Sequence, residues 1–305
     1  MKLRSMFLKA FFVLGIVPVT MALGGCSNST TEPADSGKAK GTIYMNGETR
    51  SRIYSFDVKT GTGTNLLAGS DPYVTPEGTI ICSANNGDLV EYSKDGTTKR
   101  VIVKSEIYAP YEETYNDAFK SPQLSPDGKY IAYEGQFGYR FDMYVVERQT
   151  GKLVTQFFED FTVAGFERPS WTPDGRIVFS GKPNANPGLY ITSKDFKTYE
   201  RIDQDLSDPR QPKVSPDGKL IAFILNDHLY TLNIDGTNLK QITTSDWKES
   251  WPTWSPDGQW IAIYGNTSIL LVPLNNKDGY VDLDNINDNF MTFTAFKDGQ
   301  FQWVY

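Results

Sequence analysis

Few residues of this chain could perform nucleophilic or metal-assisted chemistry, because its 305 residues include only two cysteines and one histidine. The histidine, His228, falls in the polar stretch Asn226-Asp227-His228 at the predicted start of a strand, where polar residues are common. A single histidine cannot complete a His-Glu-x-x-His zinc motif, and the sequence contains no Gly-x-Ser-x-Gly nucleophile elbow. We therefore predict no catalytic residue, no metal site and no cofactor.

Carboxylates are plentiful, so a mechanism that uses a pair of acids stays open. One set recurs at the same position of a repeated turn, which indicates a structural role: Asp127, Asp174, Asp217 and Asp257. The acidic stretch that begins at Asp282 does not fit a calcium loop, which needs an oxygen ligand at its fifth position and glycine at its sixth. Ile286 and Asn287 occupy those positions, and we expect a solvated loop.

Aromatic residues gather in the predicted connections, where rings beside charged groups suit sugars or extended peptides. Arg168 and Arg210 add positive charge to an acidic chain, and we expect them near the mouth of a central channel, where they would contact carboxylates of a ligand. The alternative for the rings is that they pack the loops onto the strands. The predicted ligand-binding residues are Arg168, Arg210, Trp251, Trp247, Tyr111 and Tyr139.

The N-terminal residues have the pattern of a secretory signal. Positive residues precede an apolar run from Ala10 to Leu23, which is shorter than the roughly 20 residues that cross a bilayer. The run ends in Leu23-Gly24-Gly25-Cys26, which resembles the bacterial lipobox. We predict a signal peptide over residues 1–25, acylation of Cys26 with chains such as palmitate, and a flexible polar tether over 26–40.

Removal of that signal leaves 27 Lys+Arg against 37 Asp+Glu, a net charge of −10. Such a surface repels nucleic acid and anionic lipid, so neither is an expected partner. With Cys26 acylated, Cys82 has no cysteine to pair with, and its place in the apolar run Thr79-Ile80-Ile81-Cys82 predicts a buried core residue.

Residues 41–305 are organised by an internal repeat. Five segments place a proline four residues before the proline of a turn with the pattern Ser/Thr-Pro-Asp/Glu-Gly, and a β-rich run follows each turn. Their paired prolines are Pro72 and Pro76, Pro122 and Pro126, Pro169 and Pro173, Pro212 and Pro216, and Pro252 and Pro256. This spacing is typical of the four-stranded blades of a β-propeller.

The two ends of this region supply a sixth blade. Gly41 to Gly61 matches the second, third and fourth strands of a repeat, and Phe301 to Tyr305 matches the first, with Trp303 aligned on Trp254 and Trp171. We predict an all-β, six-bladed propeller that is closed by pairing of the C-terminal strand with the N-terminal blade. The predicted blades are about 41–67 plus 299–305, 70–103, 120–157, 166–203, 208–243 and 249–283.

The repeated proline, Ser-Pro-Asp-Gly, Ile-Ala-Phe and Leu-Tyr pattern resembles the WD-like repeats of the TolB-type β-propeller family over residues 41–305. The resemblance is specific for the fold and says little about function, because such repeats also occur in peptidase and sugar-lyase propellers.

The expected function is a monomeric, lipid-anchored module of the bacterial cell envelope that binds a protein, peptide or glycan without catalysis. It would lie on the periplasmic side of the outer membrane, or on the outer face of the cell membrane where there is one membrane. The alternative is a polysaccharide lyase or glycosidase that acts at the channel mouth.

Overall fold

The computed structural model describes residues 39–47, 51–105, 119–137, 140–157, 165–275, 280–285, 292–294 and 300–305. The chain divides into two units, Met1–Glu32 and Pro33–Tyr305, and every described residue belongs to the second. Within these ranges no helix combines the length and apolar character that a membrane crossing requires.

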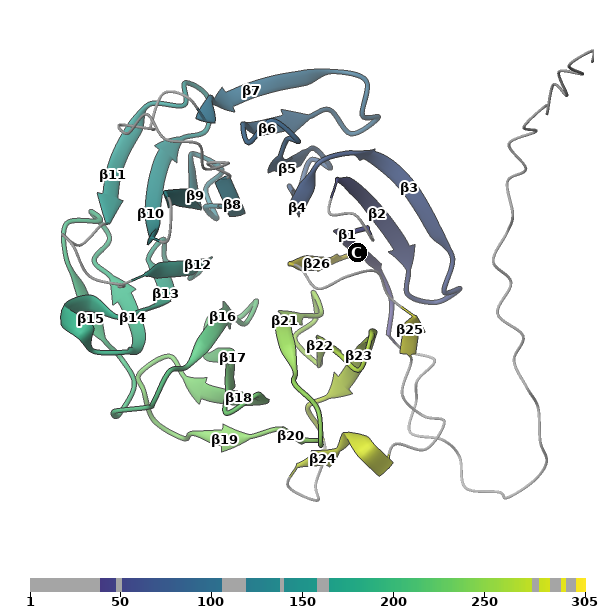
Figure 1. The fold of residues 1–305 in the computed structure, drawn as a ribbon, viewed down its shortest axis with the longest axis vertical. Coiled ribbons are helices and arrows are strands. Elements are labelled where there is room, and N and C mark those ends of the chain that lie inside the picture. Colours follow the sequence, from purple (N-terminus) through teal and green to yellow (C-terminus); the bar gives the residue numbers. More distant parts are fainter. Residues whose placement is uncertain are drawn as a thin grey trace, which may run out of the picture. The chain divides into compact units, whose positions relative to one another are not determined.

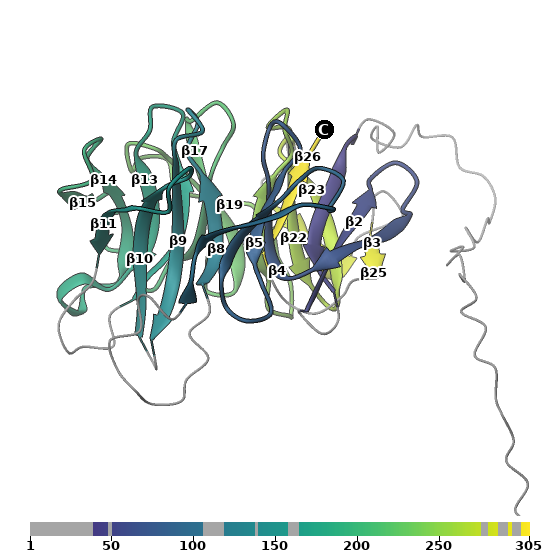
Figure 2. The ribbon, with the colours of Figure 1, turned by 90° about the horizontal axis from the view of Figure 1, so that it is seen from above.

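The described strands form six four-stranded sheets and one two-stranded sheet. Figure 1 shows the six larger sheets arranged as blades around a central axis, with β4, β8, β12, β16, β21 and β26 innermost. Figure 2 shows the blades from the side, with their strands crossing the disc from one face to the other. The prediction of an all-β, six-bladed propeller is confirmed.

Each blade is an antiparallel sheet, and we number the blades in the order of their innermost strands. Blade 1 consists of β4 (Ser70–Val74), β5 (Ile80–Ser83), β6 (Leu89–Tyr92) and β7 (Lys99–Val103). Blade 2 consists of β8 (Phe119–Leu124), β9 (Tyr130–Phe137), β10 (Arg140–Glu147) and β11 (Leu153–Phe157). Blade 3 consists of β12 (Phe166–Trp171), β13 (Ile177–Gly181), β14 (Gly188–Thr192) and β15 (Tyr199–Arg201), with the 3-10 helix η3 (Pro183–Ala185) between β13 and β14.

The remaining blades come from the C-terminal half and the two ends. Blade 4 consists of β16 (Arg210–Val214), β17 (Leu220–Leu225), β18 (His228–Asn233) and β19 (Lys240–Gln241). Blade 5 consists of β21 (Ser250–Trp254), β22 (Trp260–Gly265), β23 (Ser268–Pro273) and β25 (Thr292–Thr294). Blade 6 consists of β26 (Phe301–Val304), β1 (Thr42–Asn46), β2 (Arg52–Asp57) and β3 (Gly63–Ala68).

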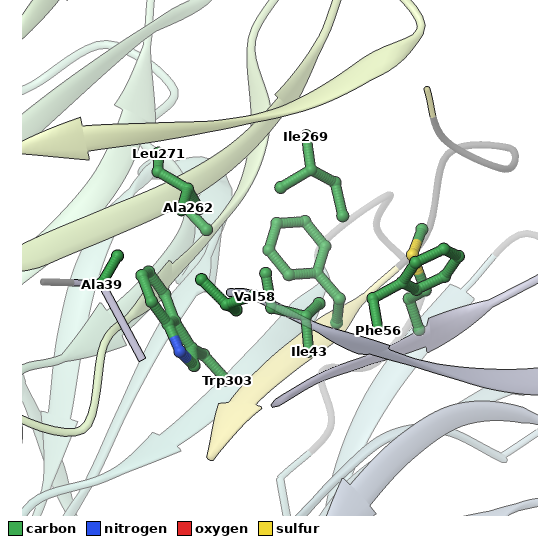
Figure 3. Close-up of a cluster of buried hydrophobic side chains, with 10 residues drawn as sticks. Ala39, Ile43, Phe56, Val58, Ala262, Ile269, Leu271 and Trp303 are labelled. Atoms are coloured by element: carbon green, nitrogen blue, oxygen red, sulfur yellow. The ribbon is translucent and has the colours of Figure 1, made fainter. Parts of the chain in front are cut away.

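Blade 6 joins the two ends of the described chain. β26 pairs antiparallel with β1, with Trp303 opposite Ile43, and the Trp303 Nε1 donates to the backbone oxygen of Lys40 at 2.9 Å. Trp303 and Ile43 are buried with Ala262 and Leu271 of blade 5 (Figure 3). Apolar clusters of this kind lie between neighbouring blades, so the C-terminal strand contributes to the interface between blades 5 and 6.

Blade 5 differs from the extent expected from the sequence. Its fourth strand is β25, which pairs with β23 and lies beyond residue 283. The segment β24 (Val281–Asp282) instead pairs in parallel with β20 (Thr243–Thr244), and the 3-10 helix η4 (Leu283–Asn285) follows it. The sequence between β23 and β25 is rich in Asn and Asp, residue types that are depleted in strands.

The repeated turns depend on their hydroxyl and aspartate residues. Ser125 Oγ donates to Asp127 Oδ1 at 2.7 Å, and the backbone N–H of Tyr130 donates to Ser125 Oγ at 2.9 Å. Gly128 leaves the turn at φ +73°, a conformation that glycine adopts without strain. Equivalent bonds join Thr172 to Asp174, Ser215 to Asp217 and Ser255 to Asp257, so the repeated aspartates are structural.

Cys82 is fully buried on β5, as its apolar surroundings in the sequence predict. Burial raises the pKa of its thiol to about 12. The thiol is therefore unreactive in the folded protein, since the thiolate is the nucleophilic form.

Candidate functional site

A bulge interrupts the innermost strand of each of blades 1 to 5. The pairing register shifts at the residue that precedes the repeated proline, and this residue has a left-handed backbone. The φ angles are 52° for Asp71, 53° for Ser121, 58° for Arg168, 56° for Gln211 and 58° for Trp251. This conformation costs about 1–3 kcal/mol for a residue other than glycine, so it persists only where neighbouring groups fix it.

Side chains of the preceding blade fix three of these bulges. The backbone N–H of Arg168 donates to Glu134 Oε1 at 2.6 Å, where Glu134 lies on β9 of blade 2. The N–H of Asp71 donates to Asn46 Oδ1 at 2.6 Å, and the N–H of Trp251 donates to Gln211 Oε1 at 2.6 Å. The bulges thus hold one residue per blade in a fixed place on the innermost strands.

Arg168 is the centre of the contacts that these residues make. Its Nη1 donates to Ser121 Oγ at 2.7 Å, and its Nε lies 3.3 Å from Glu134 Oε1. Its guanidinium carbon lies 4.3 Å from the centre of the Trp251 ring. Six residues are connected by these contacts and by the charge interactions described below, and we call them the axial cluster: Asp71, Ser121, Glu134, Arg168, Lys213 and Trp251.

Burial shifts the pKa values of two charged groups in the axial cluster. Glu134 has a fully buried side chain, and burial raises its pKa while the Arg168 guanidinium opposes that rise. The pKa of Lys213 is lowered to about 8, chiefly by burial and then by the charge of Arg168, while the charges of Glu134 and Asp71 oppose this lowering. The side chain of Lys213 is half-buried on the innermost strand of blade 4. The protein packed around it disfavours its charged form.

The structure brings together two of the predicted ligand-binding residues, Arg168 and Trp251. Arg210 lies elsewhere: its Nη2 donates to Asp227 Oδ1 at 2.7 Å, and its side chain is 47% exposed. Trp247 packs against the core between blades 4 and 5, directly over Gly265. Tyr111, Tyr139 and the predicted lipidation site Cys26 lie outside the described residues.

His228 belongs to a second polar group, centred on the buried Glu249. Glu249 accepts hydrogen bonds from the Thr243 hydroxyl and from the N–H of Leu229, the latter at 2.8 Å, and its Oε1 lies 3.2 Å from His228 Nδ1. These bonds tie the start of β18 to the connection that leads into β21. In the part of the chain that the structure describes, no group of three or more His, Cys, Asp and Glu residues could hold a metal ion.

Glu134 and Lys213 were not among the residues predicted from the sequence, although a signal for Glu134 existed. In every blade the second strand pairs with the innermost strand, and this pairing shows which residues of the six second strands are equivalent. Glu134 occupies one of these equivalent positions. Its equivalents in the other blades are uncharged: Asn46, Ser83, Ser180, Ile224 and Tyr264. A charged residue at this position of a buried strand is what a comparison of the repeats would have identified.

The fold is a six-bladed propeller whose repeats contain Ser-Pro-Asp-Gly turns. Residues 111–278, more than half of the chain, match the family described as the TolB beta propeller domain, and the chain belongs to that family.

The relatives that the chain matches include a protein named TolB and a protein named as a peptidase. The chain is 27% identical over 256 residues to the Tol-Pal system protein TolB of Francisella tularensis, covering 77% of this chain and 54% of that protein. It is 22% identical over 209 residues to the uncharacterized peptidase YuxL of Bacillus subtilis, covering 67% of this chain and 30% of that protein. The crystal structure of TolB from Acinetobacter baumannii superimposes with a TM-score of 0.61 at 19% identity, covering 86% of this chain and 66% of that one.

Proposed function

We propose that this chain is a lipid-anchored propeller of the bacterial cell envelope that binds a protein, peptide or glycan at the axial cluster and does not transform it. The observation that carries the proposal is the presence of four charged side chains on or beside the innermost strands: Asp71, Glu134, Arg168 and Lys213. Buried charge seldom adds stability over apolar packing, so its concentration here favours a binding role.

The similarity to the Tol-Pal system protein TolB and the lipobox at Cys26 both support a place in the envelope. The chain covers about half of TolB from Francisella tularensis, and a role in the Tol-Pal system is not part of the proposal.

Site-specific crosslinking in cells tests the binding role. A photoreactive aromatic residue in place of Trp251, an axial-cluster residue that is half-buried on the innermost strand of blade 5, should capture a defined partner. The matched control is the same residue in place of Lys197, whose side chain is 79% exposed on an outer turn of blade 3. A partner captured equally from both positions, or from neither, would contradict binding at the axis.

Lipidation is tested by metabolic labelling with an alkyne fatty acid. The wild-type protein should take up the label and Cys26→Ala should not, whereas Cys82→Ala should keep it because Cys82 is buried in blade 1. An unlabelled wild-type protein would remove the anchor from the proposal.

A second candidate function is acid–base catalysis on a polysaccharide, of the lyase or glycosidase kind. It is favoured by one observation, that burial moves the pKa of Glu134 up and that of Lys213 down at the same site. A screen over acidic polysaccharides would detect it. Turnover that is lost in Glu134→Gln and kept in His228→Ala would replace the binding role with catalysis.

A further inference from the structure

Arg168 and Trp251 together span the innermost edges of the propeller, and we call this pair the crossbar. Arg168 comes from blade 3, and its Nη1 donates to Ser121 Oγ of blade 2 at 2.7 Å. Its guanidinium carbon lies 4.3 Å from the centre of the Trp251 ring of blade 5. Blades 2 and 5 lie opposite each other in the ring of six blades (Figure 1). Because one guanidinium contacts both of them, it lies between opposite blades, close to the central axis.

One nitrogen of this guanidinium stays open to a ligand. Nε lies 3.3 Å from Glu134 Oε1, and Nη1 is bonded to Ser121. Nη2 has no hydrogen-bond partner among the described residues, and it is not one of the buried polar atoms that lack a partner. The Arg168 side chain as a whole is 17% exposed. Nη2 is therefore a donor that a ligand can reach, and the other contacts of the guanidinium fix its position.

Glu134 holds Arg168 from the protein side. Its side chain is 0% exposed, so a ligand meets the guanidinium and not this carboxylate. Glu134 Oε1 accepts the backbone N–H of Arg168 at 2.6 Å and lies beside the Arg168 Nε, so it fixes both the main chain and the side chain. An arginine that is already held in place loses little conformational freedom when a ligand binds to it.

The surroundings of Trp251 favour an anion over a sugar ring as the ligand. A sugar is typically bound by an open aromatic face, but Arg168 covers the Trp251 ring on one side. The ring also packs against the apolar cluster between blades 5 and 6. The axial cluster contains no second aromatic ring. The N–H groups of a guanidinium, by contrast, suit the oxygens of a carboxylate.

We propose that Arg168 Nη2 binds the terminal carboxylate of a peptide that approaches along the central axis and ends at the crossbar. A chain that follows the axis meets the guanidinium between blades 2 and 5, so it stops there and does not pass through. The carboxylate of its last residue then reaches Nη2 and forms a charge-assisted hydrogen bond. The inference rests on the proposed binding function and names the end of the partner that the axial cluster recognises.

Three libraries of random eight-residue peptides, passed over the immobilised full chain and quantified by mass spectrometry, test this assignment. The first library has free C-termini and lacks Asp and Glu. The second has the same sequences with amidated C-termini, and the third is amidated and carries one Glu at its centre. We expect the first library to be retained at least about tenfold more than the other two, because a hydrogen bond to a charged group accounts for such a factor.

Substitutions assign the contact to Arg168. Arg168→Ala/Glu134→Gln removes the guanidinium together with the buried acid that it pairs with, and retention of the first library should fall to that of the second. The matched control is Arg176→Ala, which removes a 32% exposed arginine between β12 and β13 of the same blade and should keep retention. Thermal melting verifies that each variant is folded. Arg168→Lys keeps the charge without Nη2 and should also lose the preference, so it tests the site where the double variant is unstable.

The inference is overturned if the three libraries are retained equally, if none is retained, or if the Arg168 variants keep the retention of the wild type. Retention of the third library as strong as that of the first would show that a side-chain carboxylate suffices, and it would overturn the assignment to a chain end. The proposed binding function is tested separately, because a partner crosslinked in cells through position 251 would stand even where no peptide end is preferred.

Discussion

The guanidinium carbon of Arg168 lies 4.3 Å from the centre of the Trp251 ring, although blade 4 separates the blades to which the two residues belong. Both residues occupy the left-handed position before a repeated proline. A cation over an aromatic face contributes about 0.5–2 kcal/mol, and here it joins blades 3 and 5 across the innermost edge of blade 4. The axial cluster therefore links blades that are not neighbours.

Arg168→Ala should lower the free energy of unfolding by about 3–5 kcal/mol, because it leaves the buried Glu134 without its charged partner. The double variant Arg168→Ala/Glu134→Gln should recover much of that loss, since the unpaired charge is gone. Urea denaturation measures both. A double variant as unstable as Arg168→Ala would show that the ion pair is not the cause.

Lys213 should make stability rise with pH above neutrality. Its folded-state pKa is lowered to about 8 by burial, then by Arg168, against the charges of Glu134 and Asp71. Its unfolded value is about 10.4, so between these values the unfolded chain binds more protons and the free energy of unfolding rises with pH. The stability advantage of Lys213→Met over wild type should therefore shrink from pH 7 to pH 10. Parallel urea-denaturation profiles would contradict this.

Gly265→Ala should lower the free energy of unfolding by about 1–3 kcal/mol through overpacking. A Cβ at this position would lie 1.8 Å from Cζ3 of Trp247, so one of the two must move. The cost should largely disappear in the background Trp247→Leu, where the ring is absent. Equal costs of the alanine in both backgrounds, measured by thermal melting, would exclude packing as the role of Trp247.

Deletion of residues 301–305 should abolish the cooperative thermal transition, because it removes the strand that pairs with β1 and the buried Phe301 and Trp303. Trp303→Phe should cost about 1 kcal/mol or more, since it removes the hydrogen bond to Lys40. Tyr305→Ala is the control, because Tyr305 is 73% exposed. A deletion variant that melts like the full chain would mean that β26 is dispensable.

The blades were predictable from the sequence because each repeat contains the information for a whole sheet. The turn prolines and glycines set the chain reversals, and the apolar runs between them have the length of strands. Blade 5 is the exception, since the Asn- and Asp-rich sequence before β25 did not predict that its fourth strand begins at Thr292.

The axial cluster was predictable only in part. Arg168 and Trp251 were among the predicted ligand-binding residues, but the bulge that turns each of them into the left-handed region was not expected. Arg210 was predicted from its charge and its closeness to the repeat, whereas its side chain pairs with Asp227, a contact that depends on how the hairpin between β17 and β18 folds back. Lys213 has no distinguishing pattern in the sequence, because only the register of β16 shows that it lies beside the axis.

At the left-handed bulge, the backbone conformation of an innermost strand does not depend on which side chain the bulged residue carries. Blades 1 to 5 place an aspartate, a serine, an arginine, a glutamine and a tryptophan on the same distorted backbone. Where a neighbour's side chain captures the N–H, the bond is to the main chain and does not depend on the residue displayed. A propeller of this construction can acquire a new specificity by exchanging a single residue in a blade, while its architecture stays the same.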